Sequence, residues 1–171
     1  MSRATLEENG VGTMPHLTGV NHISLSVTDL DRSEAFYTKV LGLVRMTDLG
    51  DVRVLVEPTS GFQVALAAPP QRTGSTFSEL NTGLDHIGLS AGSRADLEEW
   101  VRRFDAVGVR YTPILDLPLG HHLNFRDPDD IAWEFYVPSA AATQGVEELR
   151  ERRRPPEETE AYVEQVLHGT P

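Results

Sequence analysis

The sequence predicts an α+β fold: two βαβββ modules in one chain form a curved mixed-sheet cup with the helices outside. The first observation is a repeat, because the pattern at 19–27 (GVNHISLSV) recurs at 83–91 (GLDHIGLSA). Both copies alternate apolar and polar residues, as a strand with two different faces does. The second observation is that a helical pattern ending in glycine follows each copy. The third is that three short strand patterns follow each helix, which is typical of a duplicated supersecondary unit.

A histidine lies on the polar face of each repeat strand. His22 and His86 hold the same place in the two copies. The helix after the first strand can be capped by Asp29 or Asp31. Ser93 is the candidate cap of the second helix. The helices are expected to end at two glycines in matching positions, Gly42 and Gly108.

Three short strands are expected after each helix. They are predicted at 43–49, 52–56 and 62–67 in the first half, and at 109–116, 122–126 and 131–137 in the second. The chain then divides into a flexible lead-in (1–17), a two-module domain (18–138) and a charged helical tail (139–171). Within the domain, module one is 18–68, the linker is 69–82 and module two is 83–138. The tail is either a solvated helix or a lid or dimer clasp.

Composition excludes several classes of function. The net charge of −11 argues against nucleic-acid and anionic-membrane partners, which require clustered Lys and Arg. The absence of Cys excludes disulfides, thiolate metal sites and Cys nucleophiles. No apolar run approaches the roughly 20 residues of a membrane helix, and the polar first residues lack a signal-peptide pattern. We therefore expect a cytoplasmic protein that acts on a small molecule.

The face of each strand in the second half follows from its alternation. In the last strand, Trp133 and Phe135 should cover the helix, so Glu134 should point to the concave face that carries the repeat histidines. By the same parity, His122 rather than His121 faces the concave side. Aligning the halves by their turns pairs Glu134 with an alanine, Ala65.

Two histidines and one carboxylate on a concave surface make a facial triad. Imidazole and carboxylate bind divalent Fe, Mn, Zn or Ni, and three protein ligands leave positions open for a substrate or dioxygen. A single strand histidine is most often structural, but the symmetric repetition favours a metal site. The predicted ligands are His22, His86 and Glu134.

Other polar residues are candidates for catalysis and substrate binding. His122 is either a base near the metal-bound substrate or a solvated histidine. Asn124 and Tyr136 are substrate contacts or polar wall residues. Arg45, like Arg53, could bind a substrate carboxylate, although such arginines more often lie on the surface.

The sequence resembles the vicinal oxygen chelate superfamily, which includes glyoxalase I, extradiol dioxygenases, fosfomycin-modifying enzymes and bleomycin-binding proteins. The motifs that carry the resemblance are 20–25 (VNHISL), 84–87 (LDHI) and 125–135 (FRDPDDIAWEF), and it covers about residues 18 to 138. It implies two βαβββ modules around a metal, with His22, His86 and Glu134 at the family's metal positions. Ala65 stands where glyoxalase I supplies a fourth ligand.

The remaining pattern is closer to the extradiol dioxygenases, which use His, His and Glu on iron. The resemblance therefore implies an Fe(II) dioxygenase acting on a catechol-like molecule, with His122 and Tyr136 as candidates for that family's cavity His and Tyr. Mn(II), Ni(II) and Zn(II) are the alternative metals. A lyase or isomerase without dioxygen and a metal-free antibiotic-binding protein are the alternative functions. A homodimer is expected.

Overall fold

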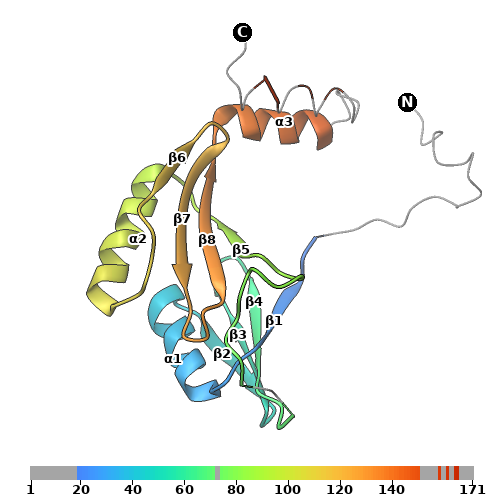
Figure 1. Cartoon of the computed structure of the whole chain (residues 1–171), viewed down its shortest axis with the longest axis vertical. Helices are drawn as coiled ribbons and strands as arrows, with labels where there is room; N and C mark the ends of the chain where they lie inside the picture. Colours follow the sequence, from blue (N-terminus) through green and yellow to red (C-terminus); the bar gives the residue numbers. More distant parts are fainter. Residues whose placement is uncertain (1–18, 72–73, 151–157, 159–160, 162–163, 166–171) are drawn as a thin grey trace, which may run out of the picture.

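The computed structural model describes residues 19–71, 74–150, 158, 161 and 164–165, and these form two four-stranded mixed sheets (Figure 1). Sheet one, ordered β1-β4-β3-β2, contains β1 (His22–Ser26), β2 (Val44–Asp48), β3 (Val52–Val56) and β4 (Gln63–Ala67). Sheet two, ordered β5-β8-β7-β6, contains β5 (Ile87–Ser90), β6 (Leu115–Leu117), β7 (Gly120–Arg126) and β8 (Ala132–Pro138). The helices are α1 (Leu30–Leu41), α2 (Arg94–Val107) and α3 (Ala140–Arg150).

The two modules have the same topology, which confirms the predicted fold class. β1 pairs with β4 in parallel, as β5 does with β8, and the other strand pairs are antiparallel. Ser24 lies opposite Ala65, and Gly88 lies opposite Glu134. Because Ser24 and Gly88 each follow a repeat histidine by two residues, the pairing of Glu134 with Ala65 across the modules is confirmed.

The predicted helix ends are also confirmed. The side chain of Asp29, rather than that of Asp31, accepts a hydrogen bond from the amide of Arg32 at 3.0 Å and caps α1. Ser93 caps α2 in the same way. Gly42 and Gly108 follow the helices with φ of 74° and 75°, a left-handed conformation that glycine adopts without a steric penalty.

The core lies between each sheet and its helix. Trp133, Phe135 and Phe125 are buried on the helix side of sheet two, where Phe104 of α2 packs against the two phenylalanines. The predicted faces of β7 and β8 are therefore confirmed. The opposite side of each sheet is called its open face here: it carries His22 in sheet one and Glu134 in sheet two.

The β7–β8 turn of module two docks on the start of α1 in module one. The Asp129 carboxylate accepts hydrogen bonds from the backbone amide of Thr28 at 2.9 Å and from the guanidinium of Arg32 at 2.6 Å. The Tyr37 hydroxyl donates to the Asp127 carboxylate at 2.7 Å. Both aspartates are buried, so these bonds satisfy groups that have lost their water.

The helices make a second contact between the modules. The guanidinium of Arg103 on α2 donates to the carbonyl oxygen of Val40, near the end of α1, at 2.8 Å. Arg103 also donates to the carbonyl of Lys39. Cationic side chains at this position satisfy the orphan carbonyls of a helix C-terminus. The relative placement of the two modules is thus fixed by polar contacts at both ends of α1.

One predicted strand is shorter in the structure. The strand predicted at 109–116 is only β6 (Leu115–Leu117), with an isolated bridge between Tyr111 and Phe125. Pro113 has no amide proton to donate to a ladder, which explains the interruption. In the charged helical tail predicted at 139–171, α3 spans Ala140–Arg150, and residues 151–171 lie largely outside the described residues, as the lead-in 1–17 does entirely.

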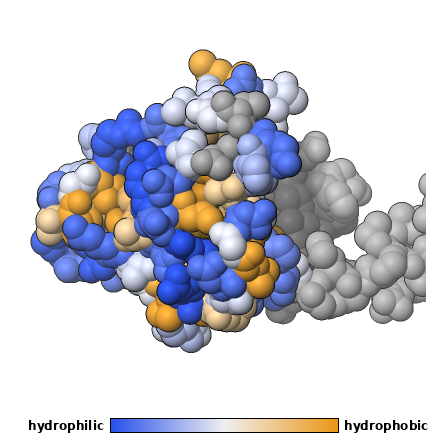
Figure 2. All heavy atoms as spheres, turned by 90° about the horizontal axis from the view of Figure 1, so that it is seen from below, coloured by the Kyte–Doolittle hydropathy of each residue, from blue (hydrophilic) through white to orange (hydrophobic). Residues whose placement is uncertain are grey.

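Apolar side chains are exposed on module one. Figure 2 views the molecule from this end and shows hydrophobic surface set among hydrophilic side chains. The large exposed apolar residues of this module are Val20, Val44, Met46 and Leu49. No helix in the described ranges has the length and apolar character needed to cross a membrane.

Candidate metal centre

Glu134 is the centre of a polar cluster on the open face of sheet two. Its side chain is 13% exposed, and each of its oxygens faces a different histidine. Oε1 lies 2.7 Å from Nδ1 of His122, and Oε2 lies 3.5 Å from Nε2 of His86. The strand register explains this arrangement, because His86 directly precedes β5 and His122 lies on β7, on the two sides of β8.

Each repeat histidine has a polar partner directly before it in the chain. Nδ1 of His86 lies 2.6 Å from Oδ1 of Asp85, and Nδ1 of His22 lies 3.0 Å from Oδ1 of Asn21. An imidazole whose Nδ1 is bound in this way presents Nε2 to a ligand. Sequence reasoning missed Asn21 and Asp85 as partners, although their position before each histidine was an available signal.

The structure brings together only part of the predicted triad. His86 and Glu134 are neighbours, but His22 does not join them within one copy of the chain. Among the described residues, no group of three His, Cys, Asp or Glu side chains is placed to hold a metal.

His122 and Tyr136 lie side by side. Their ring centroids are 4.8 Å apart, and the Tyr136 hydroxyl donates to the carbonyl of Leu119 at 2.7 Å. Burial raises the pKa of Tyr136, and the negative charge of Glu134 adds to the rise. Tyr136 is therefore a neutral phenol at physiological pH, held in place by its own hydroxyl.

The parity predicted for the two adjacent histidines is confirmed. His121 turns away from the cluster and lies 2.6 Å from Asp116, whereas His122 faces Glu134. Asn124 is the cross-strand partner of Glu134 and shares its face. The cluster on sheet two therefore contains four of the predicted site residues in addition to Glu134: His86, His122, Asn124 and Tyr136.

Arg45 lies apart from this cluster. Its guanidinium pairs with Glu34 of α1 at 3.5 Å and with Asp48 at 3.4 Å. Arg53 beside it pairs with Asp31, Glu34 and Asp48. Both arginines therefore lie on the helix side of sheet one, and the substrate contact predicted for Arg45 stays a prediction.

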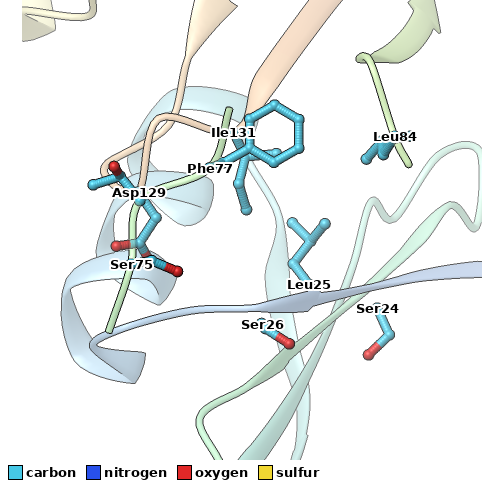
Figure 3. Close-up of a pocket in the computed structure, with 9 residues that line it drawn as sticks. Ser24, Leu25, Ser26, Ser75, Phe77, Leu84, Asp129 and Ile131 are labelled. Carbon is cyan, nitrogen blue, oxygen red and sulfur yellow. The ribbon is translucent and has the colours of Figure 1, made fainter. Parts of the chain in front are cut away.

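A small cavity lies between β1, the linker and the β7–β8 turn. It has a volume of about 260 Å³. In Figure 3, Leu25 points toward Phe77 and Ile131, whereas Ser24 and Ser26 point to the other side of β1. The two serines thus lie on the face that also carries His22.

The donors on sheet two fit a divalent metal. An imidazole Nε2 and a carboxylate oxygen are ligands that Fe, Mn, Ni and Zn accept in proteins. Gly88 stands opposite Glu134, and a Cβ there would lie 3.9 Å from Oε2, in ordinary van der Waals contact, so no side chain at this position covers the oxygen. The pair His86 and Glu134 can hold a metal with other ligands supplied from outside the module.

Fold and site together define a paired βαβββ protein with a His–carboxylate cluster on its open face. The family model for the Glyoxalase/Bleomycin resistance protein/Dioxygenase superfamily matches residues 19–135, and the chain belongs to this superfamily. The resemblance read from the sequence is therefore confirmed. Comparison with curated proteins gives no match.

Solved structures with the same fold superpose on the chain. A glyoxylase/bleomycin resistance protein/dioxygenase domain from Frankia sp. EAN1pec is 35% identical, with a TM-score of 0.67 over 72% of this chain and 100% of that one. FosX, a fosfomycin resistance protein from Listeria monocytogenes, is 20% identical, with a TM-score of 0.59 over 74% and 98%. A lactoylglutathione lyase from Agrobacterium tumefaciens is 23% identical, with a TM-score of 0.58 over 70% and 93%. The last two show a shared fold only.

Proposed function

We propose that the chain is a divalent-metal enzyme whose metal is held by His86 and Glu134 of one copy and His22 of a second copy. The observation that carries the proposal is the position of Glu134, whose Oε2 faces His86 Nε2 at 3.5 Å. His22 presents its Nε2 in the same way, because Asn21 holds its Nδ1, but within one copy it does not form a group of three ligands with this pair. FosX from Listeria monocytogenes was solved with Mn(II), which supports a metal in this fold.

The contacts between the modules favour a second copy over a rearrangement of one chain. Separating the modules would expose Asp127 and Asp129 and break their bonds to Tyr37, Thr28 and Arg32. Each of these hydrogen bonds to a carboxylate contributes about 1.5–3 kcal/mol net to stability, so losing them together would cost several kcal/mol. A homodimer instead leaves these contacts intact and brings the exposed apolar residues of module one into an interface.

The ligand set favours an oxygenase. Ala65 stands in module one where Glu134 stands in module two, so the site has three protein ligands. Three ligands leave room on the metal for two vicinal oxygens of a substrate and for a further small molecule. A divalent metal would polarise the bound oxygens as a Lewis acid, and iron(II) would add redox chemistry with dioxygen. We therefore propose an Fe(II) dioxygenase for a catechol-like substrate.

His122 is proposed as the proton acceptor, with Tyr136 as its support. Glu134 holds Nδ1 of His122, which leaves Nε2 as the basic atom. The Tyr136 ring packs beside it and limits the rotation of the imidazole. This arrangement resembles a carboxylate–histidine pair in which the carboxylate fixes the tautomer. Asn124 on the same face is a donor and acceptor for the substrate.

Oxygen consumption tests the reaction. Chain reconstituted anaerobically with Fe(II) is exposed to oxygenated buffer and a panel of catechols in an oxygen electrode. We expect stoichiometric uptake with at least one catechol and none with Zn(II)-loaded chain. Turnover of a hemithioacetal or epimerisable thioester without oxygen, and no uptake with any catechol, would replace the oxygenase with the lyase or isomerase alternative.

Co-expression tests the shared site. His22→Ala and Glu134→Ala chains carrying different tags are co-expressed, and the mixed pairs are isolated through both tags. A two-fold site places both substitutions in one of the two sites, so the mixed pair should bind about one metal per two chains. Neither variant alone should bind. Mixed pairs without metal would show that the site does not form between copies.

A further inference from the structure

The cations of the two sheets are distributed unevenly between their faces. The eight described strands carry no lysine and only three arginines, at positions 45, 53 and 126. Arg45 and Arg53 lie on the helix side of sheet one in ion pairs with acidic residues of α1 and β2. Arg126 is therefore the one cation of the described strands on an open face.

Arg126 is already neutralised by the chain itself. It shares its face with Asn124 on β7, and its guanidinium donates to both oxygens of Glu79, at 2.6 and 3.1 Å. A third bond runs to the carbonyl of Asp130 at 2.9 Å. The bonds to Glu79 raise the pKa of Arg126, with smaller contributions from the charges of Asp130 and Asp85. Its donors are thus directed to groups of this chain.

The remaining charges near the cluster are negative. Glu134 is the carboxylate at its centre, and Asp85 is beside His86 with its side chain 78% exposed. The net charge of the whole chain is −11. A bound molecule that carries a second anionic group would therefore be repelled by these negative charges. The described strands offer no free cation to offset the repulsion.

The walls of the open faces are apolar. On sheet two, Leu115 and Leu117 are the cross-strand partners of His122 and Gly120, and they are 46% and 51% exposed. On sheet one, the residues that share the face of His22 include three valines and two alanines at half-buried or buried positions: Val52, Val54, Val56, Ala65 and Ala67. Such surfaces bind an apolar body without a desolvation penalty.

We propose that the site selects a chelating molecule with an uncharged, apolar body, and that it rejects bodies carrying an additional carboxylate or phosphonate. The proposal rests on the metal site described above, because the metal receives the oxygens of the chelating end. It does not depend on whether dioxygen is consumed. The selectivity comes from the paired state of Arg126 and from the apolar walls that Leu115 and Leu117 contribute.

Hydroxamates test the selectivity separately from the reaction, because they chelate divalent metals without needing turnover. The dissociation constants of benzohydroxamate and 4-carboxybenzohydroxamate are measured calorimetrically on the Mn(II)-loaded full chain. We expect benzohydroxamate to bind at least about tenfold more tightly, which corresponds to about 1.4 kcal/mol. Equal affinities, or tighter binding of the carboxylated probe, would overturn the selectivity and leave the metal site standing. Metal-independent binding or none would overturn both.

Substitution of Glu79 tests whether the pairing of Arg126 causes this selectivity. Glu79→Gln removes the carboxylate that neutralises Arg126 and should lower the preference for benzohydroxamate by about threefold or more, within the range of a partly exposed charge pair. The matched control is Glu99→Gln, which removes the partner of Arg102 on the outer helix α2 and should leave the preference unchanged. An unchanged preference in Glu79→Gln, or an equal change in Glu99→Gln, would contradict the role given to Arg126.

Discussion

Nδ1 of His122 lies 2.7 Å from Oε1 of Glu134, so one oxygen of the central carboxylate is occupied within the chain and the other faces His86. This bond links the proposed base to the proposed ligand. It orients the carboxylate as the outer partners of metal ligands do. Proton transfer and metal binding should therefore respond differently when His122 is removed.

His122→Ala should reduce turnover more than it weakens metal binding. The loss of a positioned base reduces the rate by at least about 100-fold. The loss of an outer hydrogen bond to Glu134 should weaken metal affinity by about tenfold. The measurements are steady-state kinetics with the best catechol and a Mn(II) titration. A variant that keeps its turnover once saturated with metal would show that His122 is not the base.

His22→Ala should abolish metal binding, although the described residues of one copy form no group of three ligands. His121→Ala is the matched control, because His121 also lies on a strand but pairs with Asp116, away from the cluster. Metal content after reconstitution is measured for both variants. A metal-loaded His22→Ala protein would remove His22 from the site, and a metal-free His121→Ala protein would indicate general misfolding.

The sequence predicted the two modules from local signals, but it did not predict the individual contacts between them. The alternation in the repeat strands and the Asp29 and Gly42 helix ends are local signals, and each depends on residues within a few positions. The hydrogen bond between Asp129 and Thr28 joins residues 101 positions apart, and no periodic pattern in the sequence indicates such a contact. The placement of His22 with Glu134 at one metal stays a prediction, because the described residues of one copy contain no group of three such side chains.

Tyr37→Phe should destabilise the fold through the contact between the modules. The Tyr37 hydroxyl donates to buried Asp127 and accepts from the Trp133 indole N–H at 3.2 Å. Removing it leaves buried groups short of partners, at a cost of about 1–3 kcal/mol in the free energy of unfolding. Tyr111→Phe, which removes an exposed bond to Asp105, should change it by less than about 0.5 kcal/mol.

Urea denaturation of both variants at neutral pH makes this comparison. The slope of the unfolding free energy against urea should stay the same in each, because neither substitution changes the surface exposed on unfolding. Equal midpoints for Tyr37→Phe and the wild type would contradict the stabilising role of this bond.

Glu57→Gln should change how stability depends on acid pH. Hydrogen bonds from Ser60 and Thr59 lower the pKa of Glu57 from 4.5 to about 2. A carboxyl with a lowered folded-state pKa contributes stability above its unfolded pKa and loses it as the pH falls toward the folded value. Stability of the wild type should therefore fall more steeply than that of Glu57→Gln between about pH 4.5 and 2. Thermal melts across this range measure the difference, and parallel curves would contradict it.

The central claim is a divalent metal held by His22, His86 and Glu134 across two copies. Its most direct measurement is a Mn(II) titration of the purified, metal-stripped chain, followed by calorimetry, together with the mass of the species in solution. The account predicts about one metal bound per chain in a homodimer, with affinity that weakens at acid pH as imidazoles take up protons. A monomer that binds one metal would contradict the shared site, and a chain that binds none in excess Fe(II), Mn(II), Ni(II) or Zn(II) would contradict the metal centre itself.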